Sequence, residues 1–215
     1  VTLSQTEIQA YMSTPPTGNE EGLVGYWNFN EGTGTTASDA TSNGNDGTIY
    51  GATWSTDVPV TQTYVPDDNF EQALIDLGYD DTLDDYVLTA NISVVTSLNV
   101  SQKEISNLTG IESFTALTHL QCEYNSLTTL DVSSNTSLTH FDCGGNQLTT
   151  LDVSNNTALF SFECYDNQLT SLDVSNNTNL DELYCQNNQL TSLDISANTA
   201  LTFLHCENNQ LTALD

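Results

Sequence analysis

The sequence predicts a mainly β protein in which short parallel strands stack into a solenoid, and three observations lead to this fold class. All five cysteines of the 215-residue chain recur at a spacing of 21 residues. Asparagine and leucine residues recur in the same register after each cysteine. No insertion breaks this period between Leu117 and Asp215. Because one turn cannot bury its own apolar face, an uninterrupted series of equal turns predicts a stack that shares one core.

The repeated unit reads L-x-x-[LF]-x-C-x-x-N-x-L-x-x-L-D-[VI]-S-x-N-T-x, which is the pattern of a leucine-rich repeat. Each turn is expected to add one strand to a parallel sheet on the concave face, about 4.8 Å from its neighbour. Alternation along the strand points Phe141 and Cys143 inward and leaves His140 and Asp142 outward. The two invariant polar or sulfur-bearing columns are Cys122, Cys143, Cys164, Cys185 and Cys206, and Asn125, Asn146, Asn167, Asn188 and Asn209.

Both columns are interpreted as structural. A buried thiol behaves as a small hydrophobic group, so we expect five free, buried thiols. A disulfide between adjacent turns would distort the ladder and close only a short loop, and no C-x-x-C pair is present to favour a metal. The asparagine amides are expected to satisfy backbone groups where the chain leaves each strand.

The unit N-x-L-T-x-L-D-V-S-x-N-T-x-L-x-x-[LF]-x-C resembles the cysteine-ladder repeats of bacterial internalin-type proteins. It is closer still to the secreted leucine-rich repeat proteins of gliding and type IX-secreting bacteria. The resemblance covers about residues 64–215. It implies a solenoid covered at its N-terminal end by a helix, and it is not specific to a ligand.

The composition is strongly acidic, with 29 acidic residues against the single base Lys103 and a formal net charge of −28. This excludes nucleic acid as a natural partner, because phosphate binding requires Lys and Arg. It also argues against anionic membranes, and no apolar stretch is long enough to span a bilayer. The chain starts at Val1 and ends within a repeat, so we expect part of a larger exported protein. We therefore expect an extracellular or bacterial cell-surface location, with targeting signals outside this sequence.

Residues 1–57 are expected to be the C-terminal portion of a β-sandwich. Ser4–Glu7 forms a capping box before a short helix, and two segments, Leu23–Asn30 and Thr48–Trp54, are expected to be strands. The runs E-E-G-L-V-G-Y-W-N-F-N-E-G-T-G and S-N-G-N-D-G-T-I-Y-G-A-T-W resemble laminin-G-like jelly-roll domains, which are concanavalin-like sandwiches that often bind carbohydrate or calcium. Trp27 and Trp54 are expected to be core aromatics.

Residues 58–64 are expected to be a linker, and residues 65–91 a helical cap on the N-terminal end of the solenoid. Asp67 or Asp68 is the expected N-cap, and Gly78 the expected stop. The apolar face of this helix would contain Phe70, Ala73, Leu74 and Leu77. Residues 92–215 are expected to be leucine-rich repeats, irregular at first and regular from about residue 117. The irregular repeats would point Leu98, Val100, Ile105, Leu108, Ile111, Phe114 and Leu117 inward.

Two groups of acidic residues are candidates for other roles. Asp80, Asp81, Asp84 and Asp85 follow the capping helix, where either a calcium loop or a solvated acidic turn is possible. Their spacing does not match the D-x-[DN]-x-[DN]-G calcium loop. The second group is expected to accept hydrogen bonds within its turns, and it comprises Asp131, Asp152, Asp173, Asp194 and Asp215.

The sequence contains no G-x-S-x-G or H-E-x-x-H motif and no phosphate-binding glycine loop, so we expect no enzyme and no required cofactor, with calcium possible. The informative residues are those that vary on the outer face of the sheet, because all three histidines and several aromatics fall there. Metal binding by His119 and His140 beside Asp142 is a further, weaker alternative. The candidate binding residues are His119, Gln121, His140, Asp142, Phe160, Glu163, Tyr165, Glu182, Tyr184, Gln186, Phe203 and His205.

The function expected from this surface is adhesion to, or recognition of, a protein or carbohydrate on a cell or matrix surface. The alternative is a structural spacer or fibre subunit, in which copies associate end to end or by strand addition. Neutral variation on a solvated sheet would also explain the outward residues.

Overall fold

The computed structural model describes residues 17–20, 22–28, 33–52 and 61–212, and it separates the chain into two compact units, Val1–Pro59 and Val60–Asp215. The helix expected after Ser4 lies outside the described residues, as do Trp54 and Asp215. None of the described helices is long and apolar enough to cross a membrane.

The first unit contains one short antiparallel pair, β1 (Thr36–Ala37) with β2 (Gly47–Thr48). The strand expected over residues 23–30 is not formed in its described part, residues 23–28. Its backbone is instead bound by side chains, because Asn45 Nδ2 donates to the carbonyl of Val24 at 2.6 Å. Of the strand expected over residues 48–54, only Thr48 is in a strand among the described residues.

Trp27 is not the core aromatic that its place in the sequence suggested. Its side chain is 39% exposed, and its indole Nε1 donates to the carbonyl of Asn45 at 3.0 Å. The polar centre of this unit is Asp39, whose carboxylate accepts hydrogen bonds from the backbone N–H groups of Tyr26, Thr41 and Asn45. Polar turn contacts therefore organise much of this segment, and the laminin-G-like assignment stays a prediction.

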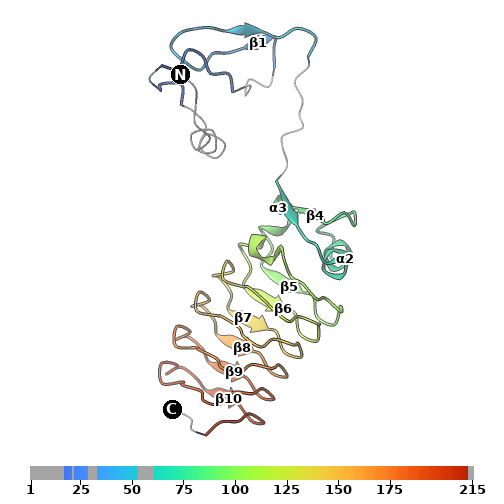
Figure 1. Cartoon of the computed structure of the whole chain (residues 1–215), viewed down its shortest axis with the longest axis vertical. Helices are drawn as coiled ribbons and strands as arrows, with labels where there is room; N and C mark the ends of the chain where they lie inside the picture. The colour runs from blue at the N-terminus through green and yellow to red at the C-terminus, as the bar shows by residue number, and fades with distance from the viewer. Residues whose placement is uncertain (1–16, 21, 29–32, 53–60, 213–215) are drawn as a thin grey trace. The chain divides into compact units, whose positions relative to one another are not determined.

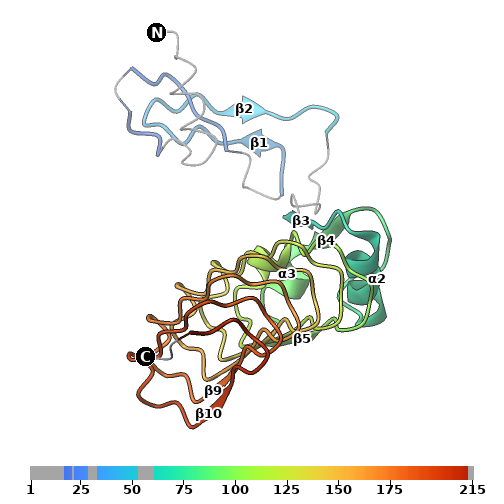
Figure 2. The same ribbon diagram turned by 60° about the horizontal axis from the view of Figure 1, so that its bottom comes forward.

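The second unit begins with a cap of two strands and two helices. Strand β3 (Gln62–Tyr64) pairs antiparallel with β4 (Tyr86–Leu88), and α2 (Asp68–Asp76) and α3 (Thr89–Ile92) complete the cap. Residues 62–64 thus belong to the cap and not to a linker. Figures 1 and 2 both show α2 at the end of the solenoid that carries β5 (Ser97–Asn99).

Helix α2 begins as its sequence predicted. One carboxylate oxygen of Asp67 accepts from the backbone N–H groups of Asn69 and Phe70, and the other accepts from Ser106 in the first repeat. The N-cap therefore also attaches the helix to the solenoid. Phe70 is fully buried, with its ring centroid 6.4 Å from that of Phe114. Leu77, expected on the buried face, is 46% exposed because it lies at the C-cap, where the helix has already ended.

The solenoid contains a six-stranded parallel sheet in the order β5 to β10, with the strands in simple sequence order (Figure 1). After β5, a short 3₁₀ helix, η1 (Ile111–Ser113), precedes the regular turns. Those turns carry β6 (His119–Gln121), β7 (His140–Asp142), β8 (Ser161–Glu163), β9 (Glu182–Tyr184) and β10 (Phe203–His205). Equivalent residues of neighbouring regular turns pair directly, so each repeat position becomes a column along the solenoid.

The core consists of the inward columns. Phe141 and Phe162 are buried on adjacent strands, with ring centroids 5.5 Å apart and planes at 11°. The seven apolar residues expected inward in the irregular repeats are all buried. This confirms the period-based assignment, including the part before residue 117, where the repeat is least regular.

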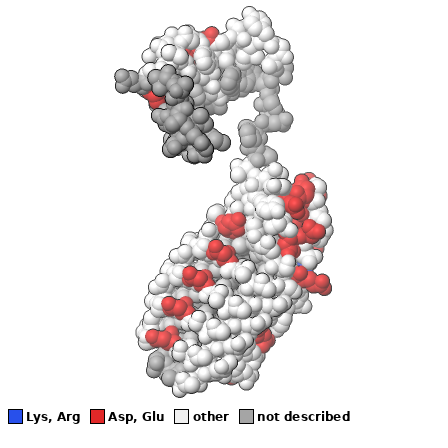
Figure 3. All heavy atoms as spheres, in the orientation of Figure 1, with Lys and Arg blue, Asp and Glu red and all other residues white. Residues whose placement is uncertain are grey.

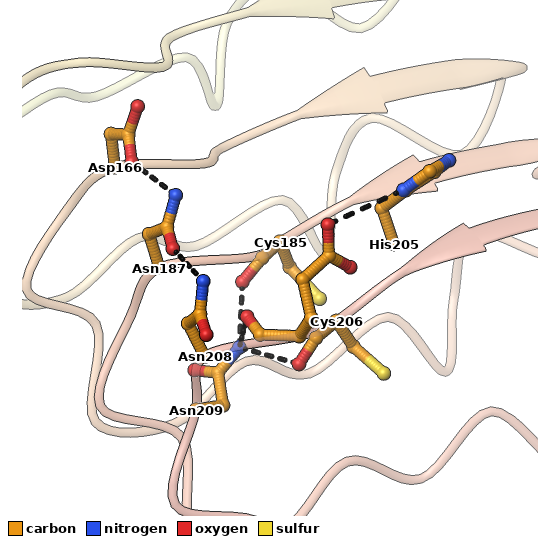
Figure 4. Close-up of polar contacts among 8 residues, drawn as sticks. Asp166, Cys185, Asn187, His205, Cys206, Asn208 and Asn209 are labelled. Carbon is orange, nitrogen blue, oxygen red and sulfur yellow. Dashed lines mark hydrogen bonds and ion pairs between the residues drawn. The ribbon is translucent and has the colours of Figure 1, made fainter.

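The cysteine ladder is confirmed as free thiols, with one correction. Cys122, Cys143, Cys164 and Cys185 are fully buried, whereas Cys206 is only half-buried. Burial raises the pKa of each buried thiol well above its usual range, to about 12 for Cys185. Cys206 follows β10, the last strand of the described sheet, so no further turn covers it there (Figure 4).

The asparagine column provides the polar part of the frame, as expected. Asn146 Nδ2 donates to the carbonyls of Cys122 and Cys143 at 3.1 and 3.0 Å, and its Oδ1 accepts from Leu127 N at 3.0 Å. Each amide thus joins two turns, and Figure 4 shows the same arrangement for Asn209 on the carbonyls of Cys185 and Cys206. A second buried ladder, which the sequence did not reveal, donates to backbone carbonyls of the preceding turn and comprises Asn135, Asn156, Asn177 and Asn198.

Candidate binding surface

The outer face of the sheet presents two columns of side chains from its strands and a third just beyond them. The first column runs His119, His140, Ser161, Glu182 and Phe203, and the second runs Gln121, Asp142, Glu163, Tyr184 and His205. The third, two residues further along each turn, runs Glu123, Gly144, Tyr165, Gln186 and Glu207.

The first column contains a stacked pair of histidines. The rings of His119 and His140 are 4.4 Å apart between centroids and nearly parallel, at 7°. Each ring Nδ1 lies about 3 Å from the hydroxyl of the preceding threonine, Thr118 or Thr139. Phe160, 45% exposed, lies beside this pair, its ring 5.9 Å from that of His140. Ser161, expected to point outward, is almost fully buried, and its hydroxyl donates to Glu182 at 3.0 Å.

Asp142 and Glu163 are half-buried on adjacent strands and face the same hollow. Burial, helped by the nearby carboxylates of Glu163 and Glu123, raises the pKa of Asp142 to about 7, although Gly144 N donates to it at 2.9 Å. Burial also raises the pKa of Glu163. The hollow has a volume of about 220 Å³, and its lining includes His119, His140, Asp142, Ser161 and Glu163.

An aromatic pair lies on the other side of these acids. The rings of Tyr124 and Tyr165 meet edge to face, with centroids 6.1 Å apart, over the intervening turn. That turn carries glycine where its neighbours carry larger residues: a Cβ on Gly144 would lie 2.4 Å from the ring of Tyr165, and one on Gly145 2.5 Å from that of Tyr124. Burial raises the pKa of Tyr165 well above its usual range, and a hydrogen bond with Tyr124 adds to this.

Tyr124 is a surface residue that the sequence reasoning missed. It occupies the left-handed position of its turn, φ 54°, where the other regular turns carry Gly145, Asp166, Asn187 and Asn208. A tyrosine in a column of glycine, asparagine and aspartate was the signal that could have identified it. In the later turns the residues of this column are joined by side-chain hydrogen bonds. Asn208 Nδ2 donates to Asn187 Oδ1, and Asn187 Nδ2 donates to Asp166 Oδ1 (Figure 4).

The C-terminal part of the sheet carries a second aromatic group. Tyr184 and His205 stack at 5.0 Å and 9°, and Phe203 is 54% exposed. His205 Nδ1 lies 3.5 Å from a carboxylate oxygen of Glu207 (Figure 4). The outer face therefore has an acidic centre between a histidine pair and a tyrosine pair, followed by an aromatic region on β9 and β10.

Larger hollows, of about 520 and 680 Å³, lie on the flank that carries Asp131, Asp152 and Asp173. Each aspartate there accepts a hydrogen bond from the backbone N–H two residues later, as Asp152 does from Ser154 at 2.9 Å. Hydrogen bonds from these serines lower the pKa of each aspartate. Since the same contact recurs in every turn, we interpret these hollows as the corrugation of the repeat; acidic side chains form such a regular row in Figure 3.

The acids after the capping helix do not converge. Asp81, Asp84 and Asp85 are exposed, and Asp84 accepts from the N–H of Tyr86. Burial raises the pKa of Asp80, as does the charge of the fully buried Glu71. Across the described ranges, no three His, Cys, Asp or Glu side chains are grouped so as to hold a metal ion. Calcium binding by these acids stays a prediction.

Comparison with known proteins agrees with this geometry. A family model for leucine-rich repeats in two copies matches residues 178–215. Together with the parallel sheet and its inward leucines, this settles the fold. The second unit contains a leucine-rich repeat solenoid. Internalin J of Listeria monocytogenes is 42% identical over 72 residues, which are 34% of this chain and 8% of that protein.

The solved functional domain of internalin J, described as including a cysteine ladder, matches with 40% identity and a TM-score of 0.67. The match covers 73% of this chain and 36% of that one, so the chain spans about a third of the structure that it resembles. Two further structures share the fold at 23% identity: a leucine-rich repeat protein of Leptospira interrogans, with a TM-score of 0.54 over 57% of this chain and 34% of its own, and a plant receptor kinase ectodomain.

The plant protein is GASSHO1/SCHENGEN3 of Arabidopsis thaliana, whose leucine-rich repeat ectodomain was solved in complex with CASPARIAN STRIP INTEGRITY FACTOR 2. Its TM-score is 0.53, and the match covers 56% of this chain and 16% of that ectodomain. The repeats described here are thus similar to internalin repeats in sequence and structure, and similar to the plant receptor in fold alone.

Proposed function

We propose that the leucine-rich repeat solenoid is a non-enzymatic recognition or adhesion module, displayed outside the cell, that binds a protein or glycan through the outer face of its sheet. The observation that carries the proposal is the difference between the two sides of each strand. Inward positions repeat from turn to turn, whereas outward positions change and include all three histidines and the exposed Phe160 and Phe203. Exposed aromatics beside acids and amides are typical of recognition surfaces.

The comparisons support this proposal by analogy. The cysteine-ladder domain of internalin J is called its functional domain, and the plant ectodomain was solved in complex with CASPARIAN STRIP INTEGRITY FACTOR 2. With Lys103 as the single Lys or Arg of the chain, nucleic acids and anionic membranes are poor partners, because both attract cationic surfaces. A protein or carbohydrate partner remains.

The test is binding of the purified protein to arrays of extracellular-matrix proteins and of glycans. The surface variant is Tyr184→Ala/Phe203→Ala, and the matched control is the flank variant Asp152→Ala/Asp173→Ala. We expect the wild type and the flank variant to bind the same array member, and the surface variant to bind it at least about tenfold more weakly.

Two results would overturn the proposal. One is equal binding by the surface and flank variants. The other is the absence of array binding together with self-association in sedimentation, which would favour the structural spacer or fibre subunit. A measured thermal midpoint close to that of the wild type ensures that each variant is folded.

A further inference from the structure

We propose that the part of the outer face formed by β6, β7 and β8 docks a basic segment of a partner protein. An arginine or lysine side chain of that segment would lie against Asp142 and Glu163, between the histidine pair and the tyrosine pair. This inference rests on the proposed function, because it names the chemistry of the partner that the same face would bind.

This part of the outer face carries negative charge that the chain does not compensate. Asp142 and Glu163 are half-buried, and one carboxylate oxygen of Glu123 is buried without a hydrogen-bond partner among the described residues. The chain's single Lys or Arg is Lys103, which lies 3.4 Å from Asp76, the last residue of helix α2. Half-buried carboxylates are costly unless a cation or a donor satisfies them. Gly144 N satisfies one oxygen of Asp142, but no Lys or Arg of the chain faces these carboxylates, so a cation from another molecule would compensate their charge.

The hydrogen-bonding groups of the hollow also favour a cationic ligand. The hydroxyls of Thr118 and Thr139 donate to the carbonyls of Thr96 and Thr118, at 2.9 and 3.0 Å. Each hydroxyl has one hydrogen, so towards the adjacent histidine Nδ1 it can act only as an acceptor. This assigns the proton of each neutral imidazole to Nδ1 and leaves Nε2 as an acceptor. The hollow thus offers mainly acceptors, which suits a guanidinium with five N–H donors or an ammonium with three.

The shape of the surface beside the acids also suits a cation. Glycine at positions 144 and 145 makes room for the rings of Tyr124 and Tyr165, and no other regular turn carries two glycines there. The exposed ring of Tyr124 and the half-buried ring of Tyr165 lie beside the acids. The face of an aromatic ring attracts a cation, which adds to the attraction by the carboxylates. A neutral glycan would also stack on such rings, but it would leave the carboxylate charge uncompensated.

The proposed site should respond to pH. Asp142 faces Glu123, Glu163 and Tyr165, and the hollow also contains His119 and His140. With the pKa of Asp142 at about 7, protonation below that value removes the negative charge that a cation needs. Affinity for a basic peptide should therefore fall by about tenfold between pH 8 and pH 6.

The experiment uses the whole chain and a fluorescent hexa-arginine peptide at about 0.15 M salt, where long-range attraction is screened. The test variant is Asp142→Asn/Glu163→Gln. The control is Asp152→Asn/Asp173→Asn, which removes the same charge from the flank. We expect at least about tenfold weaker binding for the test variant, and a change of less than about twofold for the control. Tyr165→Leu should weaken binding too, and the test variant should lose the pH dependence.

Equal weakening by both double variants would overturn the inference, because it would indicate general attraction to a polyanion. Undetectable binding by the wild type, or unchanged binding by the test variant, would overturn it as well. The outcome is separable from the proposed function: if Tyr184→Ala/Phe203→Ala abolishes array binding while Asp142→Asn/Glu163→Gln leaves it intact, the recognition face stands and the basic partner does not.

Discussion

The two sides of each strand follow opposite physical rules. On the inner side, the repeated cysteine and asparagine columns have structural roles: Cys143 is buried as an apolar group, and Asn146 bonds three backbone carbonyls and one N–H. On the outer side, Asp142 and Glu163 are half-buried with raised pKa values and no cation from the chain. A fold tolerates such unfavourable groups where they serve binding. The repeated inward residues therefore stabilise the fold, whereas the varying outward acids Asp142 and Glu163 lower its stability.

The largest expected effect concerns the thiols. Cys143 should be alkylated at least about a hundredfold more slowly than Cys206. Alkylation needs a thiolate that the reagent can reach, and burial both blocks access to Cys143 and raises the pKa of its thiol. Iodoacetamide labelling of the native protein, followed by mass spectrometry of each cysteine peptide, measures the ratio. Equal labelling rates, or a disulfide between neighbouring turns, would contradict a buried ladder.

The next effect concerns the asparagine column. Asn146→Ala should lower the free energy of unfolding by about 2–3 kcal/mol. It leaves the buried N–H of Leu127 without a partner and removes one of the two amide hydrogen bonds to each of the carbonyls of Cys122 and Cys143. Asn209→Ala is the matched control, since Asn209 makes the same bonds but is only half-buried. Urea unfolding compares the two. A larger loss at Asn209 than at Asn146 would show that burial does not govern the column.

A smaller effect concerns the glycines beneath the tyrosines. Gly144→Ala should cost about 1–2 kcal/mol, because its Cβ must displace the ring of Tyr165. Once displaced, Tyr165 should ionise closer to the usual pKa of tyrosine, which ultraviolet titration detects. Gln186→Ala, in the same column, should leave that titration unchanged. An unaltered Tyr165 in the Gly144 variant would refute the packing described for the pair.

Much of the frame could be predicted because it depends on a period. Equal spacing places Cys122 to Cys206 in one column, and alternation then assigns the inward and outward sides. The contacts between outward residues could not be predicted in the same way. The stacked rings of His119 and His140 each contact the hydroxyl of a threonine at a variable position of the repeat. The rings of Tyr124 and Tyr165 meet across the turn that lies between their own turns. The first unit has no period, which is why the prediction for Trp27 was wrong.

The claim that the varying face lowers stability is tested most directly by the free energy of unfolding of Asp142→Asn as a function of pH. The pKa of Asp142 is raised in the folded state, so the wild type loses stability as pH rises from about 4 through 7. The side-chain amide of the variant does not titrate, and its oxygen can still accept from Gly144 N. We expect equal stability near pH 4 and an advantage of about 1 kcal/mol for the variant above pH 7, discounted for solvent screening. A variant that is equally stable or less stable than the wild type at pH 8 would contradict the account.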